Sequence, residues 1–308
     1  MLKLILKRVF ITFIVLVIGI LIYGTLKQSI YDSNVVEKHK PEGKFADLGI
    51  NKIHYKYSGQ GNITFVLIAG LGESMHTWST IESELSKRGR VFMYDRSGLG
   101  FSEEGVLPRS VDNIANELHL VLEKEEIPGP YVFIGHSAGA FAARYYAKKY
   151  PDDVLGLFLI DPYQEMAKAE MGEAPFSYRM TNWLFRNMAW SGIPFFMLPK
   201  PPHPTYKTSK AIKTYGLEGN SEDISLEQFA QLERKGIEMP IYLLKADKPK
   251  SKLNDKQNRW SKEIYNKYSN PKNRYILIES GHHIHIQKPQ VVLEALDEFT
   301  AKLIEKDS

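Results

Sequence analysis

Short, continuous apolar runs alternate with amphipathic segments along most of the chain. Such runs, rich in Val, Ile, Leu and Phe, are typical of strands that are buried on both faces of a parallel sheet. They are Thr64–Ala69, Val91–Tyr94, Tyr131–Ile134, Val154–Ile160, Pro240–Asp247 and Arg274–Ile278. Between two of them, Ile114, Leu118, Val121 and Leu122 recur at helical spacing. This alternation predicts an α/β protein with a mostly parallel sheet.

One long apolar segment near the N-terminus differs from these runs. Val9 to Leu26 is a stretch of 18 residues without a charged side chain. As a helix rising about 1.5 Å per residue, it approaches the hydrocarbon thickness of a bilayer. Lys3, Lys7 and Arg8 precede it, so the positive-inside bias predicts a single-pass protein of the cell membrane with a cytoplasmic N-terminus and an extracytoplasmic main domain. A cleaved signal peptide is the alternative, but no small-x-small site follows the run.

Changes in composition divide the chain into parts. Residues 1–27 are predicted to be the membrane anchor, and the polar and charged residues 28–43 a linker. The main domain, residues 44–306, opens with a predicted hairpin over Phe45–Tyr57. Within this domain, the segment at about 163–238 is rich in Trp, Phe, Met and Pro and is too long and too aromatic for a simple loop.

Composition narrows the classes of function. The 308 residues are 43% hydrophobic, which is enough for a sizeable core. The net charge of +4 is modest, and no basic helix or aromatic-basic module indicates nucleic-acid binding. The absence of cysteine excludes disulfides, thiolate metal sites and a cysteine nucleophile.

Candidate chemistry follows the third of these strands. The strand runs into Gly135–Gly139, with the sequence GHSAG, and then into an alanine-rich helical segment. A G-x-S-x-G at such a junction puts its serine on a strained turn, clear of the sheet. The turn Gly70–Gly72 after the first strand also leaves backbone N–H groups free. We predict Ser137 as the nucleophile and the N–H groups of Leu71 and Ala138 as oxyanion donors, each typically worth about 3 kcal/mol to the transition state.

Three segments in this order, Val66–Gly72, Asp95–Ser102 and Gly135–Gly139, resemble the signatures of strands 3, 4 and 5 in the α/β-hydrolase superfamily. The resemblance covers roughly Phe45 to Lys306. It implies an α/β-hydrolase fold with a mostly parallel eight-stranded sheet, an early antiparallel strand and a helical lid at about 163–238. Because the nucleophile position holds serine, the dehalogenase and epoxide hydrolase branches, which use aspartate there, are disfavoured.

A serine nucleophile needs a base, and the base needs a carboxylate that fixes its tautomer. The resemblance implies a histidine that follows a glycine just after the last strand, a position that His282 matches better than His283 or His285. The family's usual acid lies a little beyond the turn after strand 7, where Asp247 is slightly early. In some members the acid ends strand 6, as Asp161 does here. Both positions lie at the carboxyl edge of the sheet, and we predict Asp161 with Asp247 as the alternative.

Three histidines within four residues, at positions 282, 283 and 285, are also compatible with a metal site. No carboxylate or further ligand at helical spacing accompanies them. We therefore predict neither a metal nor another cofactor.

Together these features predict a membrane-anchored serine hydrolase, with carboxylic esters of apolar acids as the small-molecule substrates. A first alternative is a binding or scaffold protein that has lost catalysis, because the usual acid is displaced. A second is a peptidase, amidase or perhydrolase on the same fold. The sequence leaves open the natural substrate, the oligomeric state and whether the anchor is cleaved.

Overall fold

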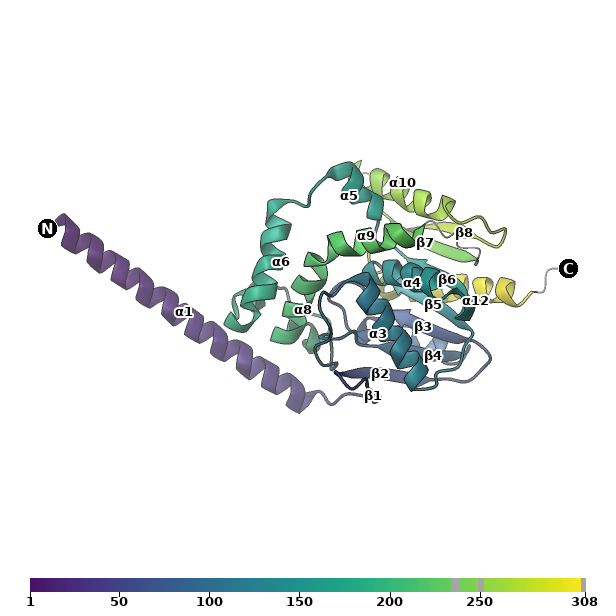
Figure 1. Ribbon diagram of the computed structural model, residues 1–308, viewed down its shortest axis with the longest axis horizontal. Helices are drawn as coiled ribbons and strands as arrows, with labels where there is room; N and C mark the ends of the chain where they lie inside the picture. The colour runs from purple at the N-terminus through teal and green to yellow at the C-terminus, as the bar shows by residue number, and fades with distance from the viewer. Residues whose placement is uncertain (234–238, 249–251, 306–308) are drawn as a thin grey trace.

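The computed structural model describes residues 1–233, 239–248 and 252–305. Its centre is an eight-stranded sheet with the order β1-β2-β4-β3-β5-β6-β7-β8 (Figure 1). The strands are β1 (Lys44–Asp47), β2 (Lys52–Ser58), β3 (Thr64–Ile68), β4 (Arg90–Tyr94), β5 (Tyr131–His136), β6 (Val154–Ile160), β7 (Ile241–Asp247) and β8 (Arg274–Glu279). Among the described strands, β2 runs opposite in direction to the other seven, and β1 and β2 form the predicted hairpin. The predicted eight-stranded, mostly parallel sheet is confirmed.

Helices cover both faces of this sheet, because the side chains of each strand alternate between the faces. In β3, Val66 and Ile68 pack under one layer of helices, while Phe65 and Leu67 pack under the other. The first layer contains α3 (Val111–Lys124), α4 (Ala138–Lys149), α9 (Glu222–Glu233) and α10 (Lys252–Asn266). The second contains η1 (Met75–Trp78), α2 (Glu82–Leu85), α11 (Ile284–Gln287) and α12 (Pro289–Ile304). The continuous apolar runs of the sequence are therefore strands covered on both sides.

A helical insertion joins β6 to β7. Its elements are α5 (Glu165–Met171), α6 (Phe176–Met188), η3 (Ala189–Ser191), α7 (Ile193–Met197), η4 (Pro204–Lys207), α8 (Ser209–Asn220) and α9, and η2 (Pro151–Asp153) precedes β6. Phe185, Ala189 and Ile212 form a small apolar core within the insertion. It lies where the sequence predicts a lid at about 163–238, although the predicted end falls in residues 234–238, outside the described residues.

The N-terminal helix α1 extends over Leu2–Lys38, and its apolar half projects away from the domain (Figure 1). Only 6% of its most apolar window is buried, and the helix is long and apolar enough to cross a membrane. Residues 28–38 of the predicted linker continue α1. Gln28 and Val35 are buried there. A contact with the insertion, which no local pattern reveals, therefore orders this polar stretch.

Candidate active site

Ser137 lies on a sharp turn between β5 and α4. Its φ of 52° and ψ of −118° place a residue with a side chain in a strained conformation. Flanking glycines make the turn possible, because a Cβ at Gly135 would lie 2.5 Å from the Cα of Ala140. A Cβ at Gly139 would lie 2.1 Å from the backbone oxygen of Ile68. Strand and helix thus approach each other as the glycine pattern predicts.

The backbone around Ser137 is fixed, whereas its hydroxyl is free. The backbone N–H donates to the Ile160 carbonyl at 3.1 Å, and the carbonyl accepts from the Tyr163 N–H at 3.0 Å. Within the described ranges, no hydrogen bond engages the Ser137 hydroxyl. The side chain is therefore held at the end of β6 with its Oγ available.

His282 pairs with Asp161, the carboxylate at the end of β6. The Nδ1 of His282 lies 2.5 Å from Oδ2 of Asp161. Asp161 is nearly buried, while 46% of the His282 side chain is exposed. The His282 ring centroid is 4.6 Å from that of His136, the residue before Ser137. The pairing at Nδ1 leaves Nε2 free, and the ring lies beside the serine turn without a hydrogen bond to the Ser137 hydroxyl among the described residues.

Lys245 holds the other side of the Asp161 carboxylate. Its Nζ donates to Oδ1 at 2.6 Å, and the Ala246 N–H donates to the same oxygen at 3.2 Å. Burial alone would raise the pKa of Asp161, but the hydrogen bond from His282 and the Lys245 ammonium outweigh it and hold the pKa below its ordinary value. Asp161 also has a positive φ of 40°. The carboxylate is thus ionised and oriented, on a residue whose backbone is strained.

Asp247, the alternative acid, has other partners. Its Oδ1 accepts from the side-chain amides of Asn254 and Asn258 at 2.6 and 2.9 Å. In the part of the chain that the structure describes, no histidine is hydrogen-bonded to it. The structure therefore brings Asp161, rather than Asp247, to His282.

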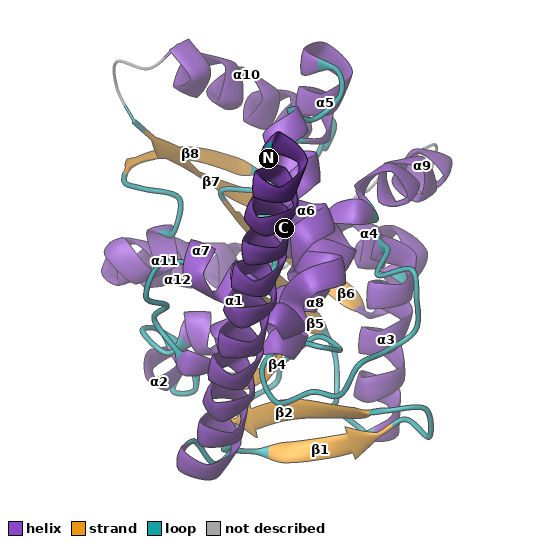
Figure 2. Ribbon diagram, turned by 90° about the vertical axis from the view of Figure 1, so that its left-hand side faces the viewer, coloured by secondary structure: helices purple, strands orange, loops and turns teal. Residues whose placement is uncertain are grey.

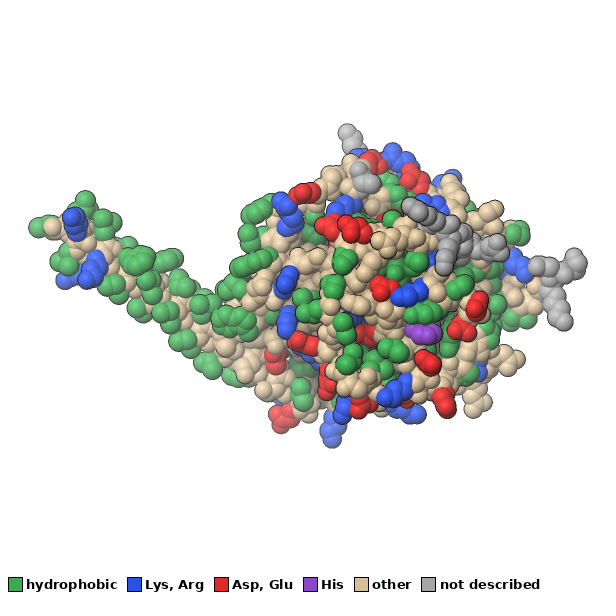
Figure 3. All heavy atoms as spheres, viewed as in Figure 1, with side chains coloured by type: hydrophobic (Ala, Val, Ile, Leu, Met, Phe, Trp, Pro, Cys, Tyr) green, Lys and Arg blue, Asp and Glu red, His purple; other side chains and the backbone are tan. Residues whose placement is uncertain are grey.

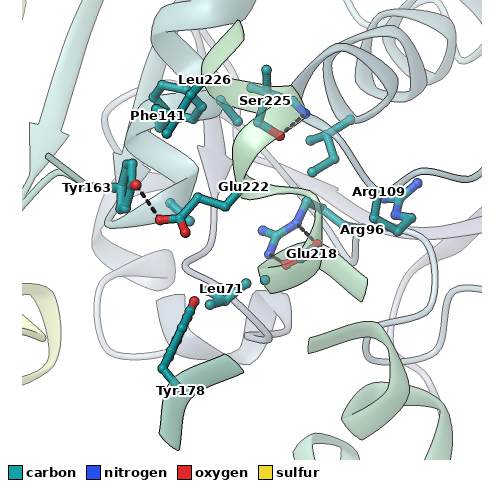
Figure 4. A pocket seen from close by; sticks show the side chains of 15 residues that line it. Leu71, Arg96, Arg109, Phe141, Tyr163, Tyr178, Glu218, Glu222, Ser225 and Leu226 are labelled. Atoms are coloured by element: carbon teal, nitrogen blue, oxygen red, sulfur yellow. Dashed lines mark hydrogen bonds and ion pairs between the residues drawn. The ribbon is translucent and has the colours of Figure 1, made fainter. Parts of the chain in front are cut away.

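The two predicted oxyanion donors lie on either side of one pocket. Leu71 follows β3, and Ala138 begins α4. Both line a small pocket of about 90 Å³ together with Phe141, Tyr163 and Tyr178 (Figure 4). Among the described residues, no backbone hydrogen bond outside regular helices and strands engages either N–H. Both donors are therefore free to face a bound group.

Glu73 connects three loops of the site, a role that the sequence analysis did not predict. Its carboxylate accepts from the Gly70 N–H at 2.8 Å and lies 3.1 Å from Nδ1 of His136 and 2.6 Å from Nε2 of His283. Gly70 directly precedes Leu71, His136 directly precedes Ser137, and His283 directly follows His282. Burial would raise the pKa of Glu73, but both histidines hold it far below its ordinary value. The one feature of the sequence that indicates this role is a carboxylate directly after the turn Gly70–Gly72.

The same cluster is the candidate place for a metal ion. Glu73, His136 and His283 offer ligand atoms that all lie within 4.8 Å of one another. In this structure the three side chains contact one another directly, so an ion would have to replace hydrogen bonds that are already made. The prediction of no metal stays a prediction.

Arg96 anchors the loop that carries Leu71. The buried guanidinium donates to the carbonyls of Ala69 and Gly70 at 2.6 and 2.7 Å. It also forms a buried ion pair with Glu218 of α8, at 2.8 Å (Figure 4). The oxyanion loop is thereby tied to the helical insertion.

A larger pocket of about 520 Å³ extends from the site into the insertion. On the site side it is lined by Leu71, Glu73 and His283. On the other side it reaches the segment Leu198–Pro202, which follows α7. The site therefore lies between the carboxyl edge of the sheet and the insertion, as ligand sites of open α/β sheets do.

Comparisons with known proteins agree with the fold. Residues 63–196 match a family model described as the alpha/beta hydrolase fold. The crystal structure of the Cif epoxide hydrolase from Acinetobacter nosocomialis has a TM-score of 0.72 at 19% identity, covering 89% of this chain and 96% of that one. The enol-lactonase from Burkholderia xenovorans has a TM-score of 0.57 at 16% identity, covering 84% and 100%. This chain has the α/β-hydrolase fold.

Curated relatives match a shorter part. An uncharacterized Bacillus subtilis protein, YqjL, is 33% identical over 104 residues, which are 34% of this chain and 41% of that protein. The (lyso)-N-acylphosphatidylethanolamine lipase of Homo sapiens is 33% identical over 101 residues, 32% of this chain and 30% of that protein. The chain therefore spans well under half the length of these relatives.

Proposed function

We propose that this protein is a membrane-anchored serine hydrolase that cleaves carboxylic esters of apolar acids through an acyl-enzyme. The observation that carries the proposal is the 2.5 Å pairing of His282 with Asp161 beside the strained turn of Ser137. A serine, an oriented imidazole and a buried carboxylate are the three groups that acyl transfer requires.

The mechanism uses each group in turn. Ser137 Oγ attacks the ester carbonyl while His282 Nε2 takes its proton. The tetrahedral oxyanion accepts hydrogen bonds from the N–H groups of Leu71 and Ala138. His282 then protonates the departing alcohol, and a water molecule repeats the sequence to release the acid and regenerate Ser137. Asp161 holds the Nδ1 proton and stabilises the imidazolium.

Several features support apolar acyl groups. Leu71, Phe141 and Leu226 line the small pocket, and Phe185, Leu198 and Ile212 line the large one. A lipase is among the relatives. In this proposal the helical insertion acts as the lid over the site.

The anchor completes the proposal. The exposed apolar half of α1 supports a membrane span, and the cations that precede it favour a cytoplasmic N-terminus. The catalytic domain would then face the extracytoplasmic side.

The alternative of a protein that has lost catalysis depended on a displaced acid. The contact of Asp161 with His282 supplies that acid, so no observation favours this alternative over catalysis.

Labelling by a serine-directed fluorophosphonate tests the proposal. The full chain in detergent micelles should be labelled, and Ser137→Ala should abolish both labelling and hydrolysis of short acyl esters. Ser83→Ala, an exposed serine of α2, is the matched control and should change neither. Labelling that persists in Ser137→Ala would falsify the assignment of the nucleophile.

A further inference from the structure

We propose that α1 and an aromatic face of the helical insertion form one membrane-docked surface, so that the larger pocket opens toward the lipid bilayer. This proposal rests on the proposed function for its substrate, a lipid ester that reaches the site from the membrane. The docking itself rests on separate observations.

The first observation is that α1 contacts the insertion at backbone distance. A Cβ at Gly24 would lie 2.1 Å from the carbonyl oxygen of Ser191. A Cβ at Gly192 would lie 2.2 Å from the carbonyl oxygen of Gly24. Small residues allow helices to pack this closely. The end of the apolar segment is thus pressed against η3 and α7.

Polar contacts fix the next turns of α1 on the insertion. Gln28 Nε2 donates to the Lys207 carbonyl at 3.0 Å, and the Tyr31 hydroxyl donates to the Pro204 carbonyl at 2.9 Å. Asp32 accepts from both the N–H and the hydroxyl of Ser209 at 3.0 and 2.5 Å. Because α1 is fixed rather than tethered, its position in a bilayer also determines the position of the insertion.

The insertion exposes large apolar side chains, here called the aromatic face. Its members, with their exposed fractions, are Phe176 (68%), Met180 (39%), Trp183 (52%), Trp190 (55%), Phe196 (59%) and Met197 (51%). The first three recur at helical spacing on one side of α6. Trp side chains favour the interface between membrane and water. The surface of a soluble protein rarely exposes so many large apolar side chains together.

This face continues the apolar surface of α1. The ring of Phe196 stacks on Tyr23 of α1 with a centroid distance of 6.2 Å. From the side on which α1 projects, α1 lies in front of α6, α7 and α8 (Figure 2). Hydrophobic side chains cover α1 and continue onto the adjoining edge of the domain (Figure 3). Lys27, Arg186 and Lys200 are exposed on the same segments, where long cationic side chains can reach the headgroup region of a bilayer.

The larger pocket connects this face with the site. Its far wall, Leu198–Pro202, directly follows α7, which carries Phe196 and Met197. An acyl chain leaving the bilayer at the aromatic face would therefore reach Leu71 and His283 without crossing the aqueous phase.

Tryptophan fluorescence tests the docking without any need for catalysis. The chain has four Trp residues, of which Trp78 and Trp260 are buried and Trp183 and Trp190 belong to the aromatic face. The full chain is reconstituted in phosphatidylcholine vesicles with brominated acyl chains, which quench tryptophan inside the bilayer. We expect marked quenching in the native chain and little in the Trp183→Phe/Trp190→Phe double variant. Equal quenching in both would overturn the proposal.

A kinetic comparison tests the path to the site. Trp183→Ser/Phe196→Ser should lose about tenfold in hydrolysis of a long-chain ester embedded in vesicles, because weaker apolar docking lowers access. It should keep its activity on a short, water-soluble ester. The matched control Leu120→Ser/Leu277→Ser changes two exposed leucines of α3 and β8 and should keep both activities.

The outcomes separate the two proposals. If the aromatic-face variant hydrolyses the vesicle ester like the control, the docking proposal is wrong and the hydrolase proposal stands. If the native chain is quenched in vesicles but Ser137→Ala retains ester hydrolysis, the assignment of the nucleophile is wrong and the docking stands. If the native chain is a dimer in detergent and the aromatic-face variant is not, the face binds a second copy of the chain. That result would overturn membrane docking.

Discussion

Two neighbouring histidines, His282 and His283, each pair with a carboxylate, but through different ring nitrogens and with carboxylates in different surroundings. His282 uses Nδ1 to contact Asp161, which leaves Nε2 free. His283 uses Nε2 to contact Glu73, at 2.6 Å. Asp161 ends a strand and is balanced by Lys245, whereas Glu73 lies in a loop.

The difference shows how one loop can serve both chemistry and position. A base needs one free ring nitrogen while a carboxylate orients the other, and both rings meet that condition. The difference lies in the carboxylates: Asp161 is held by Lys245, whereas Glu73 also contacts His136 and the Gly70 N–H. The hydrogen bond that His283 donates to Glu73 raises the pKa of His283 despite burial, and the same carboxylate accepts from the Gly70 N–H. We infer that the His282 pair moves protons and that the His283 pair fastens the loops around it.

The largest expected difference comes from removing each ring. His282→Ala should lower kcat/KM for a short ester by about 10⁴ to 10⁶, because no base remains for Ser137. His283→Ala should cost about tenfold to a hundredfold, since it removes only a positioning contact. Steady-state kinetics of both variants measures the contrast. Similar losses for the two variants would show that the pairs are not distinct in role.

The next largest effect concerns the acid. Asp161→Asn should reduce kcat by about 10⁴, because an amide cannot hold the Nδ1 proton and stabilise the imidazolium in the same way. Asp247→Asn is the matched control and should leave kcat nearly unchanged, since its partners are Asn254 and Asn258. A greater loss in Asp247→Asn would reverse the assignment of the acid.

Glu73→Gln tests the positioning role of the Glu73–His283 pair. The neutral amide cannot hold His136, His283 and Gly70 together equally well, so the oxyanion loop should shift. We expect kcat to fall about tenfold to a hundredfold with little change in KM, because the loss falls on the transition state. Glu123→Gln, on the exposed surface of α3, is the control. A change in KM alone would point to substrate binding instead.

The smallest effect is an acid sensitivity of stability that we expect from His285, a third histidine of this segment, in α11. Burial, followed by the nearby His136, lowers the pKa of His285 to about 2. An unfolded histidine binds a proton near pH 6.5, so the unfolded state gains protons first as the pH falls. The free energy of unfolding should therefore fall by about 1.4 kcal/mol for each pH unit below 6.5 because of this group.

Chemical unfolding of the full chain in detergent at pH 7, 6 and 5 measures this slope. His285→Gln can still contact the Thr77 hydroxyl, which lies 2.9 Å from Nε2, but it does not titrate. The variant should show the shallower slope. Identical slopes would assign the acid sensitivity to other groups.

The sequence by itself determined the class of fold and the local geometry at Ser137. Apolar runs alternating with amphipathic segments specify buried parallel strands, and Gly135 and Gly139 permit the close turn. These features depend on residues near one another in the chain.

Only the tertiary structure decided which distant groups meet. The choice between Asp161 and Asp247 depended on which strand end faces the loop of His282, and the roles of Glu73, Arg96 and Lys245 depended on the same strand order. The polar residues 28–38 look like a linker in isolation, yet contacts with the insertion make them part of α1. The physical reason is that a local pattern encodes burial and backbone conformation, whereas contacts between segments far apart in sequence form only when the sheet brings its carboxyl edges together.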